Sequence, residues 1–178
     1  MDDVELKVIQ TELAGDDYDI IYRDQVIAKL MRDRQYDKWR LLLKYDNNKY
    51  ILQSRTRNLL TLFLGKTQAE LIDISNDNAV LSTIPYNAII TTNFQFSDQK
   101  DTYKIKSINV FSTRYLLEKD KRVICYYNRI NNFEGKRIIN IIISEEFKDL
   151  WETNLFLQIM FGLFLHILQL MQIESITV

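Results

Sequence analysis

The segment from Leu155 to Ile173 constrains the fold of this chain more than any other feature of its sequence. Nearly every position in it is apolar, and its few interruptions are spread along its length: Gln158, Gly162, His166, Gln169 and Gln172. No amphipathic stripe can be drawn on a helix of this composition. The helix therefore needs an apolar environment on every side.

Two environments meet that requirement, a lipid bilayer and the interior of a protein. A bilayer takes about 20 apolar residues per span, which this segment approaches. Polar side chains within the segment and the absence of basic residues in the tail Glu174–Val178 count against a membrane anchor. We favour enclosure by protein, and the alternative is a small membrane protein anchored by residues 155–173 with a cytoplasmic β-domain.

The start of this helix is predicted at Ser144, which Glu145 and Glu146 follow. A serine hydroxyl can cap a free backbone amide, and carboxylates complement the positive end of the helix dipole.

The rest of the chain consists of short apolar runs separated by clusters of Asn and Asp, a pattern typical of antiparallel strands. Three hairpins are predicted: 46–49 divides 39–45 from 50–53, 76–78 divides 70–74 from 79–84, and 131–135 divides 122–130 from 136–143. Apolar and polar residues alternate within these runs, with Leu41 and Leu43 on one face and Arg40 and Lys44 on the other. Each strand therefore has one dry and one wet face.

Strands wrapped around the helix would satisfy both patterns at once. We predict a mostly β fold with one central helix (α+β), a closed antiparallel β-barrel that encloses the hydrophobic C-terminal helix. At 178 residues, the chain has the usual size of a single domain. We expect one domain over residues 1–178, with residues 1–17 as a partly ordered N-terminal extension.

Charge and cysteine content narrow the choice of partner and compartment. Lys and Arg number 23 against 24 Asp and Glu, a formal net charge of -1, so the chain as a whole does not attract a polyanion and nucleic acid is not an expected partner. The single cysteine, Cys125, cannot form an internal disulfide. The acidic N-terminus lacks the features of a secretory signal. We predict a cytoplasmic protein.

Two parts of the sequence carry a resemblance to a known family. Tyr18 to Leu30 reads as a short strand pair around Arg23-Asp24-Gln25, and the chain closes with strands over Arg122 to Asn128 and Arg137 to Ser144 before the helix. From about Tyr18 to Ile173 this succession resembles the tubby-like superfamily, which includes tubby C-terminal domains, phospholipid scramblases and LURP-one-related proteins. The resemblance implies a helix threading a closed barrel of about a dozen strands.

The same resemblance implies no ligand for this chain. Tubby members bind phosphoinositides and scramblases are membrane-associated, but no basic motif here matches a lipid site of the family residue by residue.

Signatures of catalysis and of cofactors are missing from the sequence. His166 lies in the middle of the hydrophobic helix, where a buried, hydrogen-bonded core histidine is the favoured interpretation, and Cys125 lies in an apolar strand. One histidine and one cysteine cannot make a usual zinc site, and the isolated glycines form no phosphate-binding loop. No catalytic residue, metal or cofactor is predicted, and a carboxylate hydrolase is the weakest hypothesis.

Two groups of basic residues are candidate contacts for anionic lipid headgroups or an acidic protein. The candidates are Arg32, Arg34, Lys38 and Arg40 in one group and Lys119, Lys121 and Arg122 in the other. Interleaved acids, Asp33, Asp37, Glu118 and Asp120, roughly cancel their field, so solvated polar loops are the simpler interpretation. The leading hypothesis is a non-catalytic binding or adaptor module that contacts anionic phospholipid, peripherally, or a protein partner.

Overall fold

The computed structural model describes residues 4–13, 15–33, 40–54, 67–86, 93–98, 100–108, 114–131, 135–148 and 153–176. These residues form β1 (Val4–Gln10), β2 (Tyr18–Tyr22), β3 (Gln25–Arg32), β4 (Arg40–Tyr45), β5 (Asn48–Ser54), β6 (Thr67–Asp73), β7 (Ala79–Tyr86), β8 (Asn93–Asp98), β9 (Thr102–Ser107), β10 (Arg114–Lys119), β11 (Arg122–Asn131), β12 (Arg137–Ile143), the 3-10 helix η1 (Glu145–Phe147) and the α-helix α2 (Thr153–Ile176). Within α2, the described side chains are those of residues 153–167.

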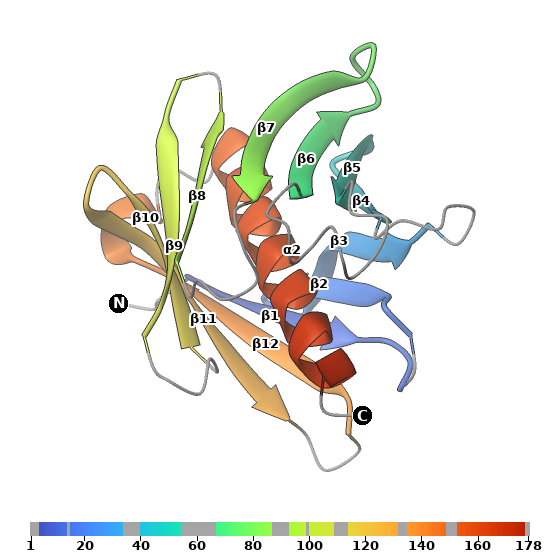
Figure 1. Ribbon diagram of the computed structural model, residues 1–178. Coiled ribbons are helices and arrows are strands. Elements are labelled where there is room, and N and C mark those ends of the chain that lie inside the picture. Colours follow the sequence, from blue (N-terminus) through green and yellow to red (C-terminus); the bar gives the residue numbers. More distant parts are fainter. Residues whose placement is uncertain are drawn as a thin grey trace.

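The strands form a closed antiparallel barrel, which confirms the predicted fold class. Each strand pairs with its neighbours in sequence, and β1 pairs with β12 to close the ring. Figure 1 shows α2 crossing the middle of this ring. Closure leaves no sheet edge exposed at the first and last strands.

The first strand corrects one prediction. Residues 1–17 were expected to form a partly ordered extension, but Val4–Gln10 is a barrel strand between β12 and β2. Leu6 and Val8 are fully buried and Glu5 and Lys7 are exposed, so the segment alternates as a strand with one dry face should. Its partners on β12 lie more than 100 residues away, as in the pair Leu6 and Ile141, so no local pattern indicates that pairing.

Tight turns join several strand pairs, and the three predicted hairpins are all present. Asp46 and Asn47, between β4 and β5, have φ values of 48° and 61°. Positive φ at both central residues is what a type I′ hairpin turn requires, and Asp and Asn tolerate it. The turns Arg23-Asp24, Asp77-Asn78 and Asp120-Lys121 share this backbone conformation.

The antiparallel order gives the barrel two distinct ends. Even-numbered strands all end at one end, which carries the turns just described and which we call the turn end. Odd-numbered strands end at the opposite end. Phe156, near the start of α2, stacks on Tyr45 at the turn end with ring centroids 4.0 Å apart. His166 lies 4.3 Å from the ring of Tyr115, at the start of β10, so α2 runs from the turn end to the opposite end.

The barrel wall encloses the described part of the helix. Every described side chain from Phe156 to Ile167 is buried, including Gln158 and His166. Gln158 accepts a hydrogen bond of 2.8 Å from the Ser82 hydroxyl of β7, which satisfies its carbonyl oxygen inside the barrel. A membrane anchor would need these side chains to face lipid, whereas here they face the strands. Within the described residues, no helix combines the length and apolarity that crossing a bilayer requires.

The helix begins later than predicted. Residues Glu145–Phe147 form a single 3-10 turn, and α2 starts at Thr153. Ser144 is extended, with φ -60° and ψ 144°, and its side chain makes no capping hydrogen bond. Its backbone N–H donates to Ile124 O at 2.9 Å, so Ser144 continues the pairing of β12 with β11 instead of opening the long helix.

Candidate anion-binding groove

The structure separates the two basic groups that the sequence suggested. Arg32 ends β3 and Arg40 begins β4, which places both at the opposite end of the barrel. Lys119, Lys121 and Arg122 surround the β10–β11 turn at the turn end. Arg34 and Lys38 lie outside the described residues. The predicted contacts therefore do not form one surface.

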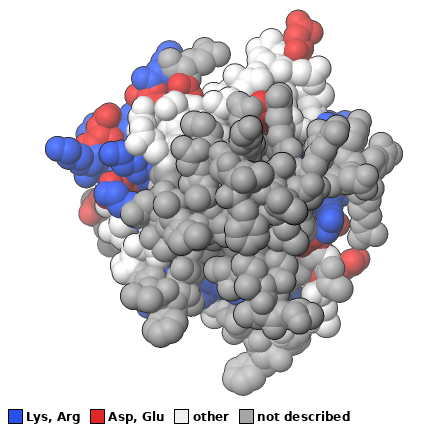
Figure 2. Space-filling view, viewed as in Figure 1, with Lys and Arg blue, Asp and Glu red and all other residues white. Residues whose placement is uncertain are grey.

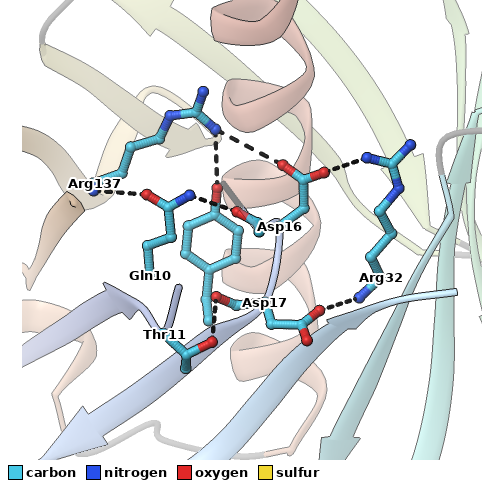
Figure 3. Close-up of polar contacts among 8 residues, drawn as sticks. Gln10, Thr11, Asp16, Asp17, Arg32 and Arg137 are labelled. Atoms are coloured by element: carbon cyan, nitrogen blue, oxygen red, sulfur yellow. Dashed lines mark hydrogen bonds and ion pairs between the residues drawn. The ribbon is translucent and has the colours of Figure 1, made fainter. Parts of the chain in front are cut away.

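Most of the described members of these groups form ion pairs with carboxylates. Arg32 pairs with Asp16 (Figure 3), and the Arg40 Nε atom lies 3.4 Å from Asp33. Lys119 lies 2.6 Å from Asp101, and Arg122 lies 2.8 Å from Glu146. Lys121 is exposed in its turn. Figure 2 shows basic and acidic side chains beside one another on the left of this view, where the β10–β11 hairpin lies in Figure 1.

A groove that sequence reasoning missed lies at the turn end of β3, β4 and β5. It has a volume of about 380 Å³ and is lined by Val26, Ile27, Ala28, Lys29, Lys44, Tyr45, Asn47, Asn48 and Lys49. The β2–β3 and β4–β5 hairpins stand side by side here, and the groove follows their ends. Three of its lining residues are lysines.

These lysines form a row across three strands. Lys29 of β3 stands directly opposite Lys44 of β4, and Lys44 stands directly opposite Lys49 of β5. Directly opposed residues have Cβ atoms about 5 Å apart on the same face of the sheet. The next residues along the strands, Leu43 and Tyr50, are buried, so the row lies on the outer face.

The local sequence of the β4–β5 hairpin explains why Lys44 and Lys49 lie opposite each other. The two-residue turn Asp46-Asn47 fixes the register of the β4–β5 hairpin, so that Lys44 and Lys49, which flank it symmetrically, must oppose each other. The pairing of Lys44 with Lys49 could therefore have been predicted from the sequence of this hairpin, although the two lysines are not neighbours in sequence. Lys29 joins the row only because β3 pairs with β4.

Carboxylates neutralise only one lysine of the row in the described structure. Asp19 of β2 lies 3.4 Å from Lys29 Nζ. No ion pair to Lys44 or Lys49 is present among the described residues. Like charges directly opposite each other on a sheet are destabilising. A negative group placed between Lys44 and Lys49 would remove this repulsion, so the groove is suited to an anion.

The buried titratable groups do not offer an alternative, catalytic site. His166 is 1% exposed, as predicted, but the expected hydrogen bond is absent, since neither ring nitrogen has a partner in the described structure. Burial, and to a smaller extent the charge of Arg129, lowers the pKa of His166 to about 3. Burial raises the pKa of the fully buried Cys125 thiol to about 12. A histidine held neutral in the core and a thiol held protonated are poor catalytic groups at neutral pH.

No three His, Cys, Asp or Glu side chains in the described parts of the chain are grouped so as to hold a metal ion. Comparisons of the chain with protein-family models, with curated proteins and with solved structures gave no match.

Proposed function

We propose that this protein is a non-catalytic binding module that docks reversibly on anionic phospholipid through the groove. The row Lys29, Lys44 and Lys49 carries the proposal, because it concentrates positive charge on one outward face and two of its members lack a carboxylate partner among the described residues. The exposed Val26 at the groove adds a small apolar contact.

The small contribution of each lysine limits the affinity of the groove for a membrane. A lysine close to an anionic membrane contributes about 1 kcal/mol, so Lys44 and Lys49, which have no carboxylate partner among the described residues, together contribute about 2 kcal/mol. Such binding is peripheral, reversible and weakened by salt, because the attraction decays within a Debye length. The negative leaflet of a plasma membrane faces the cytoplasm, which agrees with the predicted compartment.

The barrel architecture supports a relationship to a family that includes lipid-binding proteins. A closed barrel around a C-terminal helix is the arrangement that the tubby-like resemblance implies, and we propose membership of that superfamily on this ground. The lipid-facing residues proposed here come from the strand register of this chain and not from the family.

Vesicle co-sedimentation tests the proposal. Wild-type protein is mixed with vesicles of phosphatidylcholine alone and of phosphatidylcholine with phosphatidylserine, at low and at physiological salt. We expect binding only to the anionic vesicles, and a loss of about 30-fold for the variant Lys44→Gln/Lys49→Gln, the equivalent of about 2 kcal/mol.

The matched control is Lys7→Gln/Lys104→Gln, which removes the same charge from two exposed lysines on β1 and β9 outside the groove. At physiological salt its affinity for anionic vesicles should stay within about twofold of wild type, because an exposed charge outside the groove is then screened. Equal losses in the two double variants, or no wild-type binding to anionic vesicles at low salt, would reject the proposal.

A further inference from the structure

Strand β12 is apolar on both of its faces. Three of its isoleucines point into the barrel and are buried: Ile139, Ile141 and Ile143. The residues that alternate with them point outward and are half-buried: Ile138, Asn140 and Ile142. A strand that is apolar on both faces is typical of a sheet that is covered on both sides. The barrel interior covers the inner side of β12, so its outer side is the one at which a partner can pack.

The outer apolar surface continues onto the two strands beside β12 (Figure 1). Ile138 stands directly between Ile9 of β1 and Ile130 of β11. Ile9 is half-buried, and Ile130 is 48% exposed. These isoleucines form one apolar level across three strands. We call the outward residues of 5–9, 138–142 and 126–130 the β12 face.

A second level of the β12 face combines a carboxylate with a phenol. Ile142 stands directly between Glu5 of β1 and Tyr126 of β11. Glu5 is exposed, and Tyr126 is 36% exposed. A carboxylate accepts a hydrogen bond from a phenol, so the two sides of this level are chemically complementary. A contiguous surface of this kind, apolar with a polar border, marks a site of protein contact.

The level between these two is polar and holds an unsatisfied oxygen. Asn140 stands directly between Lys7 of β1 and Asn128 of β11. The Oδ1 atom of Asn140 is shielded from solvent and accepts no hydrogen bond in the described structure. Shielded polar atoms without a partner are unfavourable and rare. The terminal torsion of asparagine is soft, so the amide can turn and present this oxygen to a donor placed over the face.

A second copy of the chain fits the β12 face by symmetry. A two-fold axis that runs along β12, in the plane of the contact, places β1 of one copy over β11 of the other and keeps each level over itself. Ile9 then meets Ile130 of the second copy, and Glu5 meets the hydroxyl of Tyr126. Asn140 lies on the axis, so each Asn140 amide nitrogen can donate to the amide oxygen of the other copy. An unrelated partner would have to supply this pattern independently.

We propose that this protein forms a homodimer through the β12 face, with the two-fold axis along β12. Three strands about 5 Å apart, with five residues at a rise of about 3.4 Å, give a contact of roughly 15 Å by 15 Å. This contact is smaller than the about 800 Å² per partner of a standard interface, so the dimer is weak and reversible. The groove on β3, β4 and β5 lies outside the contact and stays open in the dimer.

Analytical ultracentrifugation of the full chain tests the proposal, at concentrations that extend into the millimolar range. We expect a monomer–dimer equilibrium. Ile130→Lys places a charge against Ile9 of the second copy and should weaken dimerisation at least about tenfold. Val80→Lys is the matched control, because Val80 is exposed on β7 outside the β12 face, and it should dimerise as the wild type does. Both variants should keep a cooperative urea transition, because they change exposed side chains.

Crosslinking tests the position of the axis. In Asn140→Cys, the two introduced thiols face each other across the axis, so a short bismaleimide should join two copies. Cys125 does not interfere, because it is fully buried. Lys104→Cys, on the exposed side of β9, is the control and should stay at the background level of crosslinking. A monomer at every concentration, which would leave a different protein as the occupant of the face, would overturn the proposal. Dimerisation that survives Ile130→Lys, or equal crosslinking of Asn140→Cys and Lys104→Cys, would do the same.

Discussion

A Cβ atom on residue 162 would clash with the hydroxyl oxygen of Tyr127, so Gly162 and Tyr127 can pack together only because residue 162 has no side chain. The close approach lets the Tyr127 hydroxyl donate to Ile159 O at 2.9 Å, inside the barrel. Both Tyr127 and Ile159 are fully buried. This contact fixes the position of α2 along the barrel axis relative to β11.

The variant Gly162→Ala should therefore be destabilised, although alanine is the better helix former by about 1 kcal/mol. Overpacking at a buried contact costs about 1 to 3 kcal/mol, and the displaced hydroxyl also loses its acceptor. We expect a net loss of about 2 kcal/mol in the free energy of unfolding, measured with urea. Tyr127→Phe removes the oxygen that clashes, so the double variant should be more stable than the sum of the two single changes predicts. Simple additivity would show that the two residues are not in contact.

Burial of neutral His166 should make the free energy of unfolding depend on pH. The pKa of His166 in the folded protein is about 3, below the ordinary value of 6.5. Between pH 6.5 and pH 3, His166 is therefore protonated in the unfolded chain but stays neutral in the folded chain. Stability should fall as the pH decreases from 6.5 towards 3, by about 3 kcal/mol at pH 4.5 from this residue alone.

The variant His166→Leu should remove that part of the pH dependence while retaining the contribution of the carboxylates. Urea unfolding at pH 7.5 and pH 4.5 measures it. Since neither ring nitrogen is hydrogen-bonded in the described structure, the variant should be at least as stable as wild type at pH 7.5. Identical losses on acidification in both proteins would contradict the assignment.

The lysine row predicts opposite effects on stability and on binding. Replacing Lys44 by Gln removes the central charge of the row and relieves repulsion with Lys29 and Lys49. We expect a gain of about 0.5 kcal/mol in stability at low salt, which shrinks as salt is added, together with weaker vesicle binding. Lys7→Gln, which has Ile21 opposite it on β2, should show no such gain. A loss of stability in Lys44→Gln would mean that the row is not under repulsion.

The seam between β7 and β8 should open before the rest of the barrel. Among the described residues of these two strands, only Ser82 with Asp98 and Thr83 with Ser97 are paired, whereas β11 and β12 share seven pairs. Pro85, two residues beyond the last of these pairs in β7, has no backbone N–H to donate to either neighbouring strand.

Amide hydrogen exchange followed by mass spectrometry tests this seam. Peptides from β7 and β8 should exchange through local opening at least tenfold faster than those from β11 and β12. Equal protection of both regions would show that the barrel opens only in the global transition.

The fold class could be predicted from the amino-acid sequence, because the signals for it are local. An all-round apolar helix needs an apolar environment on every side, alternation assigns each strand a dry face, and Asp46-Asn47 adopts the positive φ values that close a hairpin. The same turn already implies the Lys44 and Lys49 pair of the groove. The start of α2 at Thr153 was not readable, because the polar run at Ser144 suits a strand end as well as a helix cap.

The positions at which charged side chains meet depend on tertiary contacts and could not be predicted. Asp16, Arg32 and Arg137 come together because β1 closes the ring against β12, and Lys29 reaches Lys44 because β3 lies beside β4. In the basic cluster around the β10–β11 turn, Lys119 forms an ion pair with Asp101 and Arg122 forms one with Glu146, and both acids come from other parts of the chain. Backbone preference and hydrophobic periodicity depend on neighbours along the chain, whereas the field at a site depends on strand order and register, which are set by contacts between distant segments.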